Sequence, residues 1–98
     1  MEKSLNDITP DILSQVEEAA KCFFVPQEIA LMLDIEVAEM QQYMEDKQCD
    51  VYRSFHKGWL QSEYDQRKCI FKLALSGSSP AQTMVTAIRD KARLKLMD

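Results

Sequence analysis

The sequence predicts an all-α protein, for two reasons. Only two glycines and three prolines occur in 98 residues of which 46% are apolar, too few turn residues for the many reversals of a β-sandwich or barrel. Apolar residues instead recur at three- and four-residue intervals, the spacing of an amphipathic helix. We therefore expect a single helical domain over residues 1–98, whose first residues, 1–8, form a disordered tail.

The first helix is predicted to run from Pro10 to about Cys22. The hydroxyl of Thr9 can cap free N–H groups, and Pro10 suits the first helical turn because the N–H that it lacks would have no partner there. A single apolar stripe should face the core. It comprises Ile12, Leu13, Val16, Ala19, Ala20 and Phe23.

The second helix should begin at Pro26, and the third should run from about Glu36 to Asp46. Asp34 falls at the turn between them, where aspartate tolerates a left-handed backbone. A tight turn between two short helices predicts a trihelical helix-turn-helix core over residues 9–47. The expected buried faces are Ile29, Ala30 and Leu33 in the second helix and Val37, Met40 and Met44 in the third.

A long fourth helix should start near Asp50 and end at Ser76-Gly77, because glycine is the usual left-handed stop. Gly58 inside it costs about 1 kcal/mol against alanine, which indicates a kink or a close helix contact. The last, amphipathic helix restarts at SSPAQ, with Ser79 as N-cap and Gln82 completing a capping box. Residues 50–98 are thus the predicted helical assembly segment.

Charge is divided unevenly along the chain, although the net charge is only −4. Residues 1–49 carry three basic and eleven acidic side chains, a net charge of −8, and residues 50–98 carry nine basic and five acidic ones, a net charge of +4. Nucleic acid would be repelled by the first half and attracted by the second. The two halves could also pair head to tail between subunits, as in heterologous contacts that build rings.

The reactive side chains favour a non-enzymatic protein without a cofactor. Three cysteines lie far apart without a CxxC pair, and His56 is the single histidine, so neither a disulfide framework nor a metal site is predicted. No serine or cysteine nucleophile with an orienting carboxylate is evident around His56. No apolar run approaches the ~20 residues of a membrane span, and no segment of signal-peptide type is present, which predicts a cytoplasmic protein.

The turn PQEIALMLDI, followed by YRSFHKGWLQSEYDQRKCIFKLALSGSSPAQ, is similar to bacteriophage small terminase subunits of the homeodomain-like group. In that family a helix-turn-helix precedes a "Y…G" segment, a helix of charged and apolar residues, and a "lA..Gs..A" stop and restart. The similarity covers roughly residues 25–90. The matching residues are Tyr52, Gly58, Leu73-Ala74, Gly77-Ser78 and Ala81.

This resemblance implies binding of double-stranded phage DNA at the packaging site, assembly into a ring, and delivery of the DNA to a large terminase subunit. That partner would carry the ATPase and the nuclease. The chain has no GxxxxGK[ST] sequence of its own, so any ATP chemistry would belong to the partner. The implied setting is the cytoplasm of a bacterial host cell, and the sequence leaves open whether the gene belongs to a virus, a prophage or a chromosomal locus.

Candidate DNA contacts form two groups. Gln41 and Gln42 in the third helix could pair with adenine, but four acidic residues in the same segment would repel the phosphate backbone. The competing interpretation of this helix is a packed core element with an acidic solvated face. The basic residues that follow could bind phosphate or form an ordinary solvated surface. They are Lys57, Arg67, Lys68, Lys72, Arg89, Lys91, Arg93 and Lys95.

Aromatic residues recur at helical spacing along the fourth helix and are expected in the core or at a subunit interface rather than as stacking platforms for bases. Trp59, Tyr64 and Phe71 are the candidates for a homo-oligomer interface. Two other functions remain open. One is a transcription regulator that reads bases through Gln41 and Gln42, and the other is an acidic protein-interaction adaptor without nucleic-acid contact.

Overall fold

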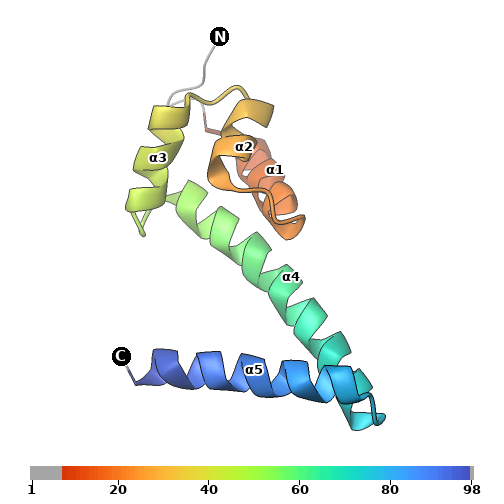
Figure 1. The fold of residues 1–98 in the computed structure, drawn as a ribbon. Coiled ribbons are helices and arrows are strands. Elements are labelled where there is room, and N and C mark those ends of the chain that lie inside the picture. The colour runs from red at the N-terminus through yellow and green to blue at the C-terminus, as the bar shows by residue number, and fades with distance from the viewer. Residues whose placement is uncertain (1–7, 98) are drawn as a thin grey trace. The chain divides into compact units, whose positions relative to one another are not determined.

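The computed structural model describes residues 8–97, so most of the tail predicted at 1–8 lies outside the described residues. The all-α prediction is confirmed (Figure 1). The helices are α1 (Pro10–Lys21), α2 (Pro26–Met32), α3 (Val37–Glu45), α4 (Asp50–Leu75) and α5 (Ser79–Leu96). The chain divides into two compact units, Met1–Ser62 and Glu63–Asp98, and α4 contributes its first half to one and its second half to the other.

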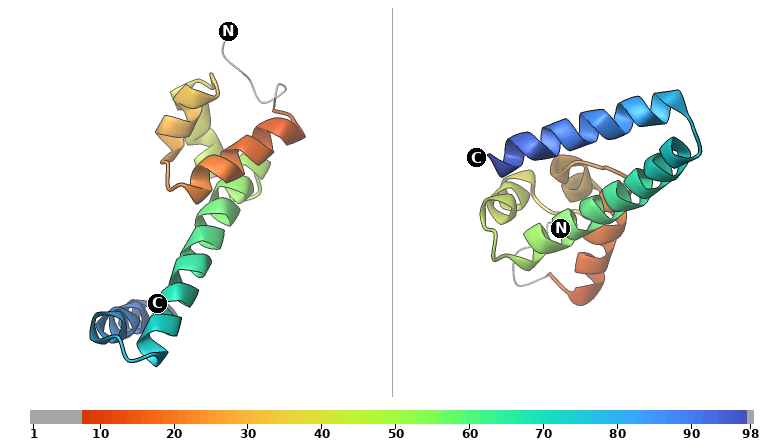
Figure 2. Two further views of the ribbon diagram at one scale, coloured as in Figure 1. Left: turned by 90° about the vertical axis from the view of Figure 1, so that its right-hand side faces the viewer. Right: turned by 90° about the horizontal axis from the view of Figure 1, so that it is seen from below.

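The first unit places α1, α2 and α3 around the beginning of α4 (Figure 2). Its start follows the prediction: the Thr9 hydroxyl accepts a hydrogen bond from the Ile12 N–H at 3.2 Å, and Pro10 occupies the first helical turn. At α2 the carboxylate of Glu28 accepts from the Val25 N–H at 3.0 Å, which satisfies one of the free donors of that helix start. The three short helices with their intervening turn are compatible with the predicted trihelical arrangement.

Helices α1, α2 and α4 all end in the same way. Each is followed by a residue with a left-handed backbone: Phe23 with φ 64°, Asp34 with φ 58° and Gly77 with φ 102°. The N–H of the next residue then donates to the carbonyl oxygen five residues back, which is the Schellman arrangement. These bonds join Phe24 to Ala19, Ile35 to Ala30 and Ser78 to Leu73. The predicted stops at Asp34 and Gly77 are confirmed, whereas Phe23 had been assigned to the apolar stripe of α1.

The core of the first unit joins all four helical segments. It contains Ile12, Val16, Ala19, Ala20, Ile29, Ala30, Ile35, Met40, Tyr43, Val51 and Phe55. The prediction for α3 was partly wrong: Met40 is buried, but Val37 and Met44 only pack against the core, and the side chain that is buried with Met40 is Tyr43. Leu33 is likewise half-buried.

Gly58 makes the close helix contact that its position suggested, and α4 continues through it without interruption. A Cβ added at Gly58 would overlap the carbonyl oxygen of Glu17 and lie 3.0 Å from the Cβ of Ala20. One turn further along α4, the Ser62 hydroxyl donates a hydrogen bond to the Lys21 carbonyl oxygen. Because glycine brings the two backbones together, α1 lies directly on α4 at this level.

The second unit consists of the end of α4 and α5, with Ala81 as the only buried apolar residue among the described residues 63–97. The predicted cap of α5 was wrong by one residue. The hydroxyl of Ser78, not of Ser79, accepts from the Ala81 N–H at 3.3 Å. Gln82 does not complete a capping box; its side-chain amide donates to the Ala74 carbonyl oxygen at 3.1 Å and so ties α5 to the end of α4.

Candidate nucleic-acid interface

The exposed surface of α2 and α3 is acidic. From Cys22 to Asp46 the chain carries six acidic residues and no basic one. Gln41 and Gln42, the two candidates for base readout, are both exposed on α3, and Glu45 follows Gln41 by one helical turn. A DNA duplex approaching this surface would meet negative charge. The surface has no basic side chain that could neutralise a phosphate and release the counterions of the DNA, so these helices are poorly suited to phosphate contact.

An apolar groove lies between the start of α2 and α3. It encloses about 320 Å³. Its side chains are mostly aliphatic or thioether groups with two amides among them, and they are Val25, Pro26, Gln27, Val37, Met40, Gln41 and Met44. The structure thus places Gln41 at an apolar groove, while Gln42 is not part of its lining. The residue pattern did not predict this groove, although the absence of basic residues between Lys21 and Lys47 argued against DNA binding there.

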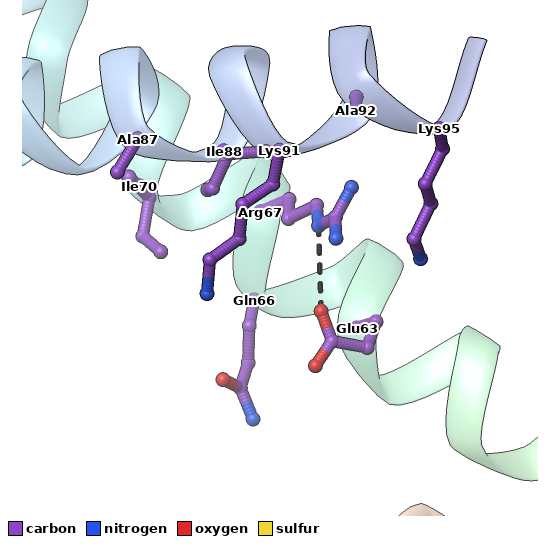
Figure 3. A pocket seen from close by; sticks show the side chains of 9 residues that line it. All are labelled: Glu63, Gln66, Arg67, Ile70, Ala87, Ile88, Lys91, Ala92 and Lys95. Atoms are coloured by element: carbon purple, nitrogen blue, oxygen red, sulfur yellow. Dashed lines mark ion pairs between the residues drawn. The ribbon is translucent and has the colours of Figure 1, made fainter. Parts of the chain in front are cut away.

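A second groove, of about 370 Å³, lies within the second unit between α4 and α5 (Figure 3). Ile70, Ala87, Ile88 and Ala92 form its apolar part. Arg67, Lys91 and Lys95 bring three of the predicted basic residues together along it, with Glu63 and Gln66 on the α4 side. This groove is the surface on which candidates from both α4 and α5 lie together.

The cations of this groove differ in how far they are neutralised. Arg67 pairs with Glu63, with Nε and Oε2 3.3 Å apart, whereas no ion pair is found for Lys91 or Lys95 within residues 8–97. Side-chain stems of Lys91 and Lys95 extend from α5 along the groove in Figure 3. Two ammonium groups one helical turn apart can contact neighbouring phosphates, and the ion-paired arginine would add less charge.

The other basic candidates lie elsewhere. Lys68 sits over the ring of Tyr64, 4.6 Å from its centroid, and lines a shallow surface depression with Lys72 and Phe71. Arg89 pairs with Asp90 at 3.4 Å. Arg93 is exposed on α5, and Lys57 is exposed on α4 in the first unit.

The three candidates for an oligomer interface have different environments. Trp59 is half-buried in the first unit, where its ring lies 4.6 Å from that of Phe23 and 6.0 Å from that of Phe55. Tyr64 and Phe71 in the second unit are 58% and 44% exposed. Trp59 therefore packs within the first unit, and Tyr64 and Phe71 remain on the surface together with the other exposed large apolar side chains of the second unit. These are Leu73, Leu75, Met84, Leu94, Leu96 and Met97.

Possible metal ligands do not converge in the part of the chain that the structure describes. His56 packs against the rings of Tyr52 and Phe55, with centroids 4.2 and 5.2 Å away. Among residues 8–97, no group of three or more His, Cys, Asp or Glu side chains is arranged to hold a metal ion. The described helices also include none with the length and apolar character needed to cross a membrane.

Comparison of the chain with protein-family models, with curated proteins and with solved structures finds no match.

Proposed function

We propose that this chain is a non-enzymatic helix-turn-helix protein that recruits double-stranded DNA and assembles as an oligomer, the role that its resemblance to phage small terminase subunits implies. The observation that carries this proposal is the separation of charge between the units. Met1–Ser62 contains five basic and twelve acidic residues, and Glu63–Asp98 contains seven basic and four acidic ones. DNA would therefore bind the second unit and be repelled by the first.

Within the second unit the groove between α4 and α5 is the favoured phosphate site. Lys91 and Lys95 supply two cations without an ion pair among the described residues, and Arg67 supplies a third that Glu63 partly neutralises. Such contacts fix the position of a duplex without reading its sequence. Sequence preference, if the protein has any, would have to come from DNA shape or from a second subunit.

Support for assembly comes from the small core of the second unit. Of its described residues only Ala81 is buried, while Phe71, Leu75 and Leu94 are 44%, 91% and 65% exposed. Two helices with so little buried apolar surface have weak internal stabilisation, since most helical stability in proteins comes from packing an amphipathic face. Association with further copies would bury these side chains and stabilise the unit.

The salt dependence of DNA binding tests this proposal. For Lys91→Ala/Lys95→Ala, we expect the slope of log affinity against log salt to become shallower by about two, because each phosphate neutralised contributes about 0.9. The control variant Lys68→Ala/Lys72→Ala removes the same amount of positive charge, but from a surface of α4 outside the groove, and it should change the slope less. Equal slopes for the wild type and both variants would contradict DNA binding at this groove.

A second candidate function is a protein-interaction adaptor, and the acidic α2–α3 surface with its apolar groove favours it. The absorbance spectrum of the purified protein distinguishes the two functions. A DNA-recruiting protein should be purified with bound nucleic acid and a raised ratio of absorbance at 260 to 280 nm, and high salt should remove that excess. An adaptor would show the ratio expected from its own aromatic residues at every salt concentration. Gln41→Ala/Gln42→Ala should leave DNA affinity unchanged in either case, which separates both from a base-reading regulator.

A further inference from the structure

We infer that the apolar groove between α2 and α3 binds α5 of a second copy of this chain. This inference rests on the assembly part of the proposed function and does not require DNA binding. The groove combines apolar groups such as Val25 and Met44 with the amides of Gln27 and Gln41 at its edges. Leu31, one helical turn after Gln27 and 71% exposed, extends the apolar surface along α2.

The charge around the groove indicates that its partner carries basic residues. Glu28 lies on α2 beside the lining residue Gln27, and Glu45 lies on α3 directly after the lining residue Met44. No basic side chain occurs between Lys21 and Lys47. An apolar groove of about 320 Å³ between acidic helices is suited to a few aliphatic anchors carried by a basic segment, rather than to a phosphate backbone.

The last turns of α5 have this combination. Leu94 and Met97 are 65% and 78% exposed and lie three residues apart on one side of the helix, next to Arg93. With about 100° between successive residues of a helix, Met97 lies opposite Ile88 and Ala92, which line the groove with α4, and Leu94 lies at the margin of that groove, seven residues after the lining residue Ala87. In Figure 3, Lys91 and Lys95 also extend along that groove, so they stay available for phosphate when the other side of α5 is covered.

This contact would join two different surfaces of the same chain. α5 carries four basic residues and one acidic residue, and the segment from Cys22 to Asp46 carries six acidic and no basic ones. The charges are therefore complementary between copies. Because the two surfaces are not the same patch, a single contact of this kind is heterologous and generates a ring or an open chain, whereas two copies that exchange it reciprocally would form a two-fold dimer.

A charge exchange in the full-length chain tests the contact. Gln41→Lys/Glu45→Lys makes the groove edge basic, and Arg89→Glu/Arg93→Glu makes one flank of α5 acidic. We expect each pair of substitutions alone to weaken self-association by at least about tenfold, because like charges then face each other. The four substitutions together should restore association to within about threefold of the wild type, since opposite charges face each other again. Light scattering and sedimentation over a concentration series provide the measurement.

A matched control uses α1. Ser14→Lys/Glu18→Lys introduces the same charge change at the same four-residue spacing on an exposed helix face away from the groove, and it should leave association unchanged. Circular dichroism of every variant establishes that the helices are intact. The inference is overturned if the groove variant associates like the wild type, if the α1 control weakens association equally, or if the combined variant is not restored. A wild-type chain that is monomeric at all concentrations would instead remove the assembly part of the proposed function.

Discussion

The ring of Phe23 meets the ring of Trp59 edge to face, with centroids 4.6 Å apart and an angle of 73° between the planes. Phe23 follows the C-cap of α1 in a left-handed conformation with φ 64°, a backbone region that bulky side chains rarely adopt. The cost of that conformation is offset by the burial of the ring against α4. The Phe23–Trp59 contact therefore fixes both the end of α1 and its position on α4.

Coupling between these two rings can be measured with a double-mutant cycle. Phe23→Leu, Trp59→Leu and the double variant should give a coupling free energy of about 0.5–1.5 kcal/mol, the range for aromatic pairs beyond their area burial. The free energy of unfolding from urea titration, followed by circular dichroism, provides the values. Phe24→Leu combined with Trp59→Leu is the control and should be additive within about 0.5 kcal/mol. Additive effects in the first cycle would mean that the ring contact contributes nothing beyond burial.

Gly58→Ala should destabilise the first unit, although alanine is the better helix former. The added methyl group would overlap the Glu17 carbonyl oxygen and lie 3.0 Å from the Ala20 Cβ, and inserting a group into a packed contact typically costs about 1–3 kcal/mol. Unfolding in urea, monitored by Trp59 fluorescence, measures this loss. Ser54→Ala, on the same helix, is the control and should change the free energy of unfolding little. A Gly58→Ala variant more stable than the wild type would contradict the close contact between α1 and α4.

Adjacent serines at the start of α5 give a matched pair of variants. Ser78→Ala removes the hydroxyl that accepts from the Ala81 N–H and should cost about 1 kcal/mol of helix stability. Ser79→Ala lies inside the first turn and should be nearly neutral. The helical signal of the two variants during thermal unfolding compares them directly. A larger loss from Ser79→Ala would return the cap to the position predicted from the sequence.

Helix boundaries were predictable wherever one residue type has a strong local preference. Thr9-Pro10, Asp34 and Gly77 all mark ends that the structure has at the same place. Phe23 was not predictable as a left-handed stop, because phenylalanine has no local preference for that conformation and the ring contact with Trp59 comes from 36 positions away in the sequence. At the start of α5 the sequence offered two neighbouring serines before one proline, and local preference alone could not choose between them.

The candidate site was predictable as a set of residues but not as a surface. Helical spacing within α4 or α5 shows which side chains share a face of that helix. It does not show that Arg67 of α4 lines the same groove as Lys91 and Lys95 of α5, because that depends on the turn between the helices. That turn is set by the left-handed Gly77 and by the bond from the Gln82 amide to the Ala74 carbonyl oxygen. Nothing in the residue pattern specified the apolar groove beside Gln41, because it joins residues from both sides of a turn.

The small core of the second unit has a consequence for its backbone. With Ala81 as its one buried apolar residue among those described, α5 can open at a low free-energy cost, and its amide hydrogens should exchange with solvent well before those of α1. Any partner that covers α5 would slow this exchange in proportion to its occupancy. If copies of the chain associate through α5, as we propose, association and the ordering of α5 form a single coupled equilibrium, and the folded fraction of this helix should rise with protein concentration.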